Sequence, residues 1–304
     1  MLSRDIMEQL STILQLVICG VTNGCIYAIV GIGFSIIYGG TQVINFAQGE
    51  FVMIGAMVAA ALLAKFSLLV AFPVAVAAGC LVGALLAICV LVPLKRASVV
   101  SLIIMTIGAS ILLRGLAQLF WGEEVKQVPY FTGIAADDDR VFHVLGAALT
   151  AQQVWVVGIT LVLVVAMHLF FKYTLIGRGM RACSMNSAGA TLVGISVRKM
   201  IVLSFVMAAG LGAIAGVTVA PWCSARCQMG TALGLSGFCA AVLGGLGNFG
   251  GAITAGLLLG IVEALTGYVI PAMSDYKDAV AFVILLIVLL VKPEGILSRR
   301  KATA

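Results

Sequence analysis

Charged side chains are scarce in this sequence. Asp, Glu, Lys and Arg make up 10% of the 304 residues, whereas hydrophobic residues make up 62%. Soluble domains carry about 25% charged residues, so this composition excludes an ordinary soluble enzyme or binding domain. Apolar runs of about 18–20 residues or more recur from end to end, as in membrane helices. Their continuity also argues against alternating barrel strands, and we therefore expect an all-α polytopic membrane protein.

Residues for hydrolysis or group transfer are equally scarce. The only histidines are His143 and His168, and they offer no Ser–His–Asp set. No stretch matches G-x-x-x-x-G-K-[ST], because the glycine-rich 244–251 is not followed by Lys and Ser or Thr. Cys223 and Cys227 are spaced for a disulfide or a metal pair but lack His or acidic partners. The sequence thus assigns no catalytic residue, no metal site and no bound cofactor.

Nine apolar segments divide the chain. One of them, Leu235–Leu246, is shorter than the other eight. It would rise only about 18 Å as a helix, which is too short to cross a hydrocarbon core of about 30 Å. It is predicted to be a re-entrant or broken helix within one transmembrane domain over residues 1–304. Eight segments are predicted to span the membrane: 12–38, 51–66, 68–94, 98–120, 151–171, 200–221, 251–270 and 279–292.

Loop charges predict the orientation of these segments. Basic residues mark the cytoplasmic side, so loop 172–199, which has no acid, and the basic C-terminal stretch are expected there, and the acid-rich loop 122–150 outside. The same rule explains the net charge of +6 without nucleic acid. Counting crossings puts the N-terminus outside, unless the stretch around Glu50 hides another half-crossing. The basic residues used are Lys95, Arg96, Lys172, Arg178, Arg181, Arg198, Lys199, Lys292, Arg299, Arg300 and Lys301, and the acids are Glu123, Glu124, Asp137, Asp138 and Asp139.

Small residues recur at four-residue spacing in four of the apolar segments. Such pairs allow helix backbones to approach closely, which helps helices associate in lipid. We favour packing within the chain over a dimer face for each pair. The pairs are Gly20 with Gly24, Gly79 with Gly83, Gly212 with Gly216, and Gly256 with Gly260.

Polar side chains interrupt the apolar pattern in VINFAQGEF, residues 43–51. Asn45 and Gln48 are three residues apart and would share a helix face, whereas Glu50 projects about 200° from Gln48 and Gly49 weakens the helix. One interpretation is a cytoplasmic turn with solvated side chains. The other is a break that lines a translocation path, with Asn45 and Gln48 facing it and Glu50 bonding a neighbouring element.

Three more polar side chains lie in apolar segments. Asn23 is predicted either to line the path or to hydrogen-bond across helices. Charges within a membrane are costly and point to function unless they reach the headgroups. Arg114 lies some seven residues from a segment end, which favours snorkelling to the outer surface. Glu263 lies late in its segment and is expected to reach the same interface.

Several ordered motifs together resemble one transporter family. GVTNGCIYAIVGIGFSIIYG followed by VINFAQGEFVMIGA is similar to the start of branched-chain amino-acid ABC transporter permeases. GLSGFCAAVLGGLGNFGGAITAGLLLGIVEAL and YKDAVAFVILLIVLLVKPEGIL resemble the C-terminal half of that family, and GRGMRACSMNSAGATLVGIS resembles its cytoplasmic coupling segment. The resemblance covers nearly the whole chain.

The resemblance implies a multi-pass importer subunit in a bacterial inner membrane. Its partners would be two ATPase subunits that bind the ATP, a sister permease or second copy, an extracytoplasmic solute-binding protein and membrane lipid. A short helix over Arg181–Gly194 would enter a groove on the ATPase, with Arg181, Asn186, Ala190 and Gly194 as candidate contacts.

Two departures from the family pattern bear on solute and coupling. Family members often carry His where this chain has Gln48, and acids where it has Ser184 to Ser187. Homologous permeases also serve urea, short amides and small aromatic carboxylates, so the solute stays open between these and branched-chain amino acids. A stand-alone ion-coupled carrier and a passive channel are the competing classes.

Overall fold

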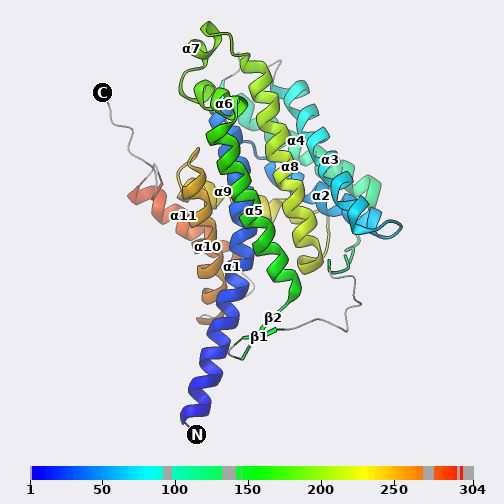
Figure 1. Cartoon of the computed structure of the whole chain (residues 1–304), viewed down its shortest axis with the longest axis vertical. Coiled ribbons are helices and arrows are strands. Elements are labelled where there is room, and N and C mark those ends of the chain that lie inside the picture. Colours follow the sequence, from blue (N-terminus) through cyan, green and yellow to red (C-terminus); the bar gives the residue numbers. More distant parts are fainter. Residues whose placement is uncertain are drawn as a thin grey trace.

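The computed structural model describes residues 2–91, 98–131, 142–144, 146–269, 277–292 and 295–296 (Figure 1). Predicted charges at Lys95, Arg96, Asp137–Asp139 and Arg299–Lys301 lie outside these ranges. The elements in chain order are α1 (Leu2–Thr41), α2 (Gln48–Leu63), α3 (Leu68–Leu86) with a π-helical end (Ala87–Leu91), α4 (Val99–Trp121), β1 (Phe142–Val144), β2 (Ala147–Leu149), α5 (Ala151–Tyr173), α6 (Leu175–Met185), α7 (Ser187–Leu192), α8 (Val197–Cys223), α9 (Met229–Leu243), α10 (Phe249–Val269) and α11 (Lys277–Val291).

The predicted all-α membrane architecture is confirmed, although helix lengths differ from expectation. Six helices of the described chain are long and apolar enough to cross a membrane: α1, α3, α4, α5, α8 and α10. The remaining apolar helices α2, α9 and α11 have 16, 15 and 15 residues, so each rises about 22–24 Å. The sequence predicted one short element, near α9, and took the segments of α2 and α11 for full spans.

The centre of the molecule is built from α1 and α8, packed with α2, α9 and α10. α8 buries 14 of its 27 residues, whereas α4 buries only Thr106, Ser110 and Ala117. The apolar side chains that α4 exposes suit lipid or another apolar partner rather than water. Elements far apart in sequence therefore meet in the middle, and the largely exposed α4 contributes its few buried polar positions to that centre.

Glycine pairs hold the central helices together, as predicted. Gly20 and Gly24 of α1 face Gly256 and Gly260 of α10; a Cβ on Gly24 would lie 2.7 Å from Leu257 Cα. The other two pairs also pack within the chain: Gly79 and Gly83 meet α8, and Gly212 and Gly216 meet α2. All four pairs thus serve intramolecular packing.

The two ends of the molecule carry different elements. α6 and α7 lie at one end, and the β1–β2 hairpin lies at the other beside the N-terminal half of α1 (Figure 1). Gln15 Oε1 of α1 accepts a 2.7 Å hydrogen bond from the Ala148 amide of β2. The N-terminal end of α1 is therefore on the side of the loop predicted to be external, in agreement with the crossing count.

Candidate functional site

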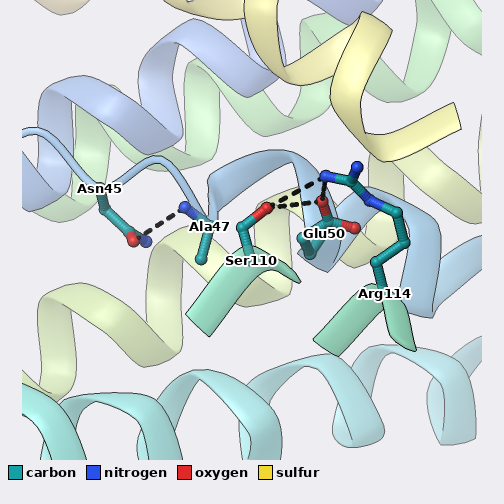
Figure 2. A network of polar contacts seen from close by, with 5 residues as sticks. All are labelled: Asn45, Ala47, Glu50, Ser110 and Arg114. Atoms are coloured by element: carbon teal, nitrogen blue, oxygen red, sulfur yellow. Dashed lines mark hydrogen bonds and ion pairs between the residues drawn. The ribbon is translucent and has the colours of Figure 1, made fainter. Parts of the chain in front are cut away.

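The stretch VINFAQGEF forms a buried break between α1 and α2. α1 ends at Thr41, Gln42 has φ +56°, and α2 begins at Gln48. Asn45 Oδ1 accepts a 3.1 Å hydrogen bond from the Ala47 amide and so shapes the turn (Figure 2). Asn45, Gln48 and Glu50 are each at most 1% exposed. The interpretation as a turn with solvated side chains is wrong, because these side chains are buried in protein.

Glu50 is paired with a cation from α4. Its Oε1 lies 2.8 Å from an Arg114 guanidinium nitrogen and accepts a 2.8 Å hydrogen bond from Ser110 Oγ (Figure 2). Arg114 also donates to Ser110 Oγ at 3.3 Å. The Glu50 side chain is 2% exposed and that of Arg114 28%. The predicted bond from Glu50 to a neighbouring element is confirmed. The predicted snorkelling of Arg114 is wrong, because its guanidinium pairs with Glu50, which lies 64 positions away in the sequence.

A cavity of about 260 Å³ adjoins this ion pair. Glu50, Ser110 and Arg114 form its polar wall. Three aromatic rings also line it, with the Phe238 ring 5.7 Å from that of Phe34 and 5.6 Å from that of Phe46. A cavity with an apolar lining and a few converging polar groups is the usual form of a small-molecule site.

Asn45 and Gln48 lie behind this cavity rather than on its wall. Gln48 Nε2 donates a 3.0 Å hydrogen bond to the Ala208 carbonyl of α8. Its side chain fills the space beside Gly33 of α1 and Gly212 of α8, where glycine leaves room for it. The amide therefore fastens α2 to α8, and neither it nor Asn45 lines the cavity in this conformation.

Asn23 and Glu263 lie elsewhere, around a second hollow of about 400 Å³ between α1 and α10. Tyr27 donates a 2.8 Å hydrogen bond to Glu263 Oε2, and Glu263 is 3% exposed. Glu263 therefore does not reach the interface as predicted but is held by α1. Asn23, only half-buried, is separate from the break at Asn45–Glu50.

Three glycines bring the starts of the short helices α2 and α9 together. A Cβ on Gly49 would collide with the Gly230 carbonyl and lie 2.8 Å from Gly234 Cα. A Cβ on Gly230 would lie 2.9 Å from Glu50 Oε2. Sequence reasoning missed this crossing, although Gly230 and Gly234 have the four-residue spacing that indicates close helix contact. We call Gly49, Gly230 and Gly234 the glycine crossing.

The predicted coupling helix is two helices. Thr174 Oγ1 accepts from the Gly177 amide at the start of α6, and Asn186 Oδ1 accepts from the Gly189 amide at the start of α7. Asn186 is extended, with φ −154° and ψ 100°, and this breaks the single helix expected over Arg181–Gly194.

Exposure divides the four candidate contacts with the ATPase. Arg181, Asn186 and Gly194 are exposed, whereas Ala190 is buried. Gly194 has φ +85°, which ends the segment with a turn that favours glycine. Sequence reasoning missed the exposed apolar residues Met185, Leu192 and Val193, which are 88%, 89% and 75% exposed. We call the exposed part of α6 and α7 the basic-apolar face.

Cys223 and Cys227 are unbridged thiols in different environments. Cys223 is exposed, whereas Cys227 is 2% exposed and its Sγ lies 3.3 Å from the Gly122 carbonyl, to which it can donate. Burial raises the pKa of the Cys227 thiol, and nearby Lys126 offsets part of that rise. The described residues contain no group of three His, Cys, Asp or Glu that could hold a metal.

We expect a membrane-impermeant maleimide to label Cys223 faster than Cys227. The thiolate is the form of cysteine that reacts with maleimide. Because the pKa of Cys227 is raised, a smaller fraction of this thiol is ionised at a given pH, and the rate of Cys227 labelling should rise as the pH is raised. Mass spectrometry of Cys223→Ser and Cys227→Ser proteins in sealed vesicles checks this. Faster labelling of Cys227 would contradict its burial.

Comparison with known proteins agrees with this architecture. A family described as the permease component of branched-chain amino acid transport systems matches residues 16–289. The high-affinity branched-chain amino acid permease protein LivH of Escherichia coli K12 is 34% identical over 96% of this chain and 97% of its own length. BraD of Pseudomonas aeruginosa is 33% identical over 96% and 98%.

The fold is also shared with a solved structure. A chain of PsaBC from Streptococcus pneumoniae, solved in complex with Fab, superposes with a TM-score of 0.53 over 97% of both chains at 15% identity. At that identity the likeness concerns the fold alone. The chain belongs to the family of permease components of branched-chain amino acid transport systems.

Proposed function

We propose that this chain is a permease subunit of an ATP-driven importer for branched-chain amino acids in a bacterial inner membrane. The observation that carries the proposal is the Glu50–Arg114 pair on the wall of a small cavity in a family member. Charges inside a membrane are costly and mark solute pathways. A wall that offers both signs of charge suits a zwitterion better than urea, short amides or small carboxylates.

The proposed complex contains two ATPase subunits, a sister permease or second copy, and an extracytoplasmic solute-binding protein. The sequence has no phosphate-loop motif, so ATP would be hydrolysed by the partner subunits. The basic-apolar face, with Arg181 beside exposed Met185 and Leu192, supports ATPase docking at that end. The loop charges support a cytoplasmic location for this end of the molecule and for the C-terminus.

Within this complex, Asn45, Gln48 and Glu50 would form the break in the helices along the solute pathway. Gln48 has one fixed hydrogen bond, to Ala208 O, while its Oε1 has no partner in the described structure. We propose that Asn23 contributes at a second level, through the hollow between α1 and α10.

Reconstitution tests the proposed function. The complete complex in proteoliposomes is expected to accumulate leucine only with ATP and the binding protein. Omission of the ATPase subunits should reduce accumulation to the level of empty vesicles. Full-rate uptake by the isolated chain would instead favour a carrier or channel. Uptake of urea or acetamide but not leucine would assign another solute.

A further inference from the structure

We propose that the Glu50–Arg114 pair is a binding station for the backbone of a zwitterionic amino acid. The solute's ammonium would bind Glu50, its carboxylate would bind Arg114, and its side chain would lie against the aromatic lining. This inference rests on the proposed function and adds the residues that recognise the solute.

Two unused polar atoms in the pair carry the proposal. Glu50 Oε1 accepts from both Ser110 and Arg114, whereas Glu50 Oε2 is buried without a hydrogen-bond partner among the described residues. Arg114 Nε is likewise buried without a partner there. Buried polar groups are nearly always satisfied in native proteins, so each exception calls for an explanation. Glu50 therefore keeps one unused acceptor and Arg114 one unused donor, and these two groups are complementary to an ammonium donor and a carboxylate acceptor.

The cavity beside these atoms suits a solute as small as a single amino acid. Its volume, about 260 Å³, falls below the range of about 300–1,000 Å³ typical of sites for drug-sized ligands. Phe34, Phe46 and Phe238 offer an apolar surface for a branched side chain. The polar and apolar parts of such a solute therefore each meet a matching wall.

Helix starts add to the recognition of charge. Gly230 and Thr231, in the first turn of α9, line the cavity. The N-terminal end of a helix carries partial positive charge, which stabilises a nearby carboxylate. Discontinuous helices of transporters present such ends to anionic solute groups. The start of α9 lies beside Glu50, since a Cβ on Gly230 would lie 2.9 Å from Glu50 Oε2, and it therefore stabilises the buried carboxylate of the pair.

Net charge makes the station selective. The charges of Glu50 and Arg114 sum to zero, so a bound zwitterion leaves no uncompensated charge in the cavity. A solute with only an ammonium or only a carboxylate would leave one protein charge poorly matched, which is costly at low dielectric constant. We expect leucine to bind more tightly than an analogue that lacks its carboxylate or one that lacks its ammonium group.

Solute analogues combined with substitutions provide the test. Affinity of the purified permease–ATPase complex is measured by calorimetry for leucine, 3-methylbutylamine and 4-methylpentanoate. The wild-type complex is expected to prefer leucine by about tenfold to hundredfold, the size of one charged hydrogen bond. Glu50→Gln should abolish the preference over 4-methylpentanoate, which lacks the ammonium. Arg114→Gln should abolish the preference over 3-methylbutylamine, which lacks the carboxylate.

Controls separate recognition from folding. Arg114→Gln strands the buried Glu50 carboxylate, and Glu50→Gln leaves the half-buried Arg114 without its partner. The double variant Glu50→Gln with Arg114→Gln removes both charges and should keep the assembly intact in gel filtration. Glu123→Gln changes an exposed acid of the external loop and should keep the wild-type preferences.

Two outcomes would overturn the station. The first is wild-type selectivity in an assembled Glu50→Gln, Arg114→Gln double variant, which would make the pair purely structural. The second is equal wild-type affinity for all three solutes, or none for leucine. Failure of the proposed function gives a different result, namely no ATP-dependent uptake of leucine by the complete wild-type complex.

Discussion

Gly49→Ala is expected to prevent stable assembly of the chain. The added methyl group would collide with the Gly230 carbonyl and crowd Gly234, both of which are backbone contacts that no side-chain rotation can relieve. Overpacking of a core costs about 1–3 kcal/mol, and we expect at least the upper end here. The yield of monodisperse protein and its thermal midpoint in detergent measure the loss.

Gly158→Ala is the matched control. Gly158 lies on exposed α5, and a Cβ there meets nothing within 4 Å. The same substitution should therefore leave yield unchanged or raise stability, because alanine favours helix over glycine by about 1 kcal/mol. A Gly49→Ala protein as stable as Gly158→Ala would refute the tight approach of α2 and α9.

Met185→Asp combined with Leu192→Asp is expected to detach the ATPase subunits. These side chains are 88% and 89% exposed on α6 and α7, at the end proposed to dock the ATPase. Central apolar contacts in an interface are worth about 2 kcal/mol or more each, which corresponds to a loss of about 30-fold in affinity per residue. Co-purification with a tagged ATPase subunit, followed by ATP-dependent uptake, measures the effect.

A charge placed at the opposite end controls for that variant. Val125 is 59% exposed in the loop that follows α4, so Val125→Asp adds an acid without touching α6 or α7. It should co-purify with the ATPase as the wild type does. If the Met185 and Leu192 variant also retains its ATPase, the docking surface lies elsewhere.

Sequence reasoning predicted the membrane helices because length and hydropathy are local properties. It placed the segments of α4, α5 and α10 within about two residues of their observed bounds. It also predicted the break at VINFAQGEF from polar residues that lipid would not tolerate. α2 has 16 residues and α9 has 15, so both are shorter than the helices long enough to cross a membrane, and the depth of such a helix depends on tertiary contacts that hydropathy does not encode.

The pairing of polar residues that lie far apart in the chain could not be predicted from the sequence. Arg114 looked like a snorkelling residue and Glu263 like an interfacial one, since their partners Glu50 and Tyr27 lie 64 and 236 positions away. The break between α6 and α7 was within reach, because Asn186 is a favoured residue at a helix start. The burial of Ala190 could be predicted only after the break between α6 and α7 was known, because the break sets which face of α7 is turned inward.

The opposite charges of Glu50 and Arg114 bear on how the membrane voltage acts on transport. Moving one elementary charge through 100 mV changes the free energy by about 2.3 kcal/mol. A neutral pair carrying a neutral zwitterion moves no net charge as it turns from one face to the other. Uptake driven through this pair should therefore proceed at the same rate in polarised and depolarised vesicles.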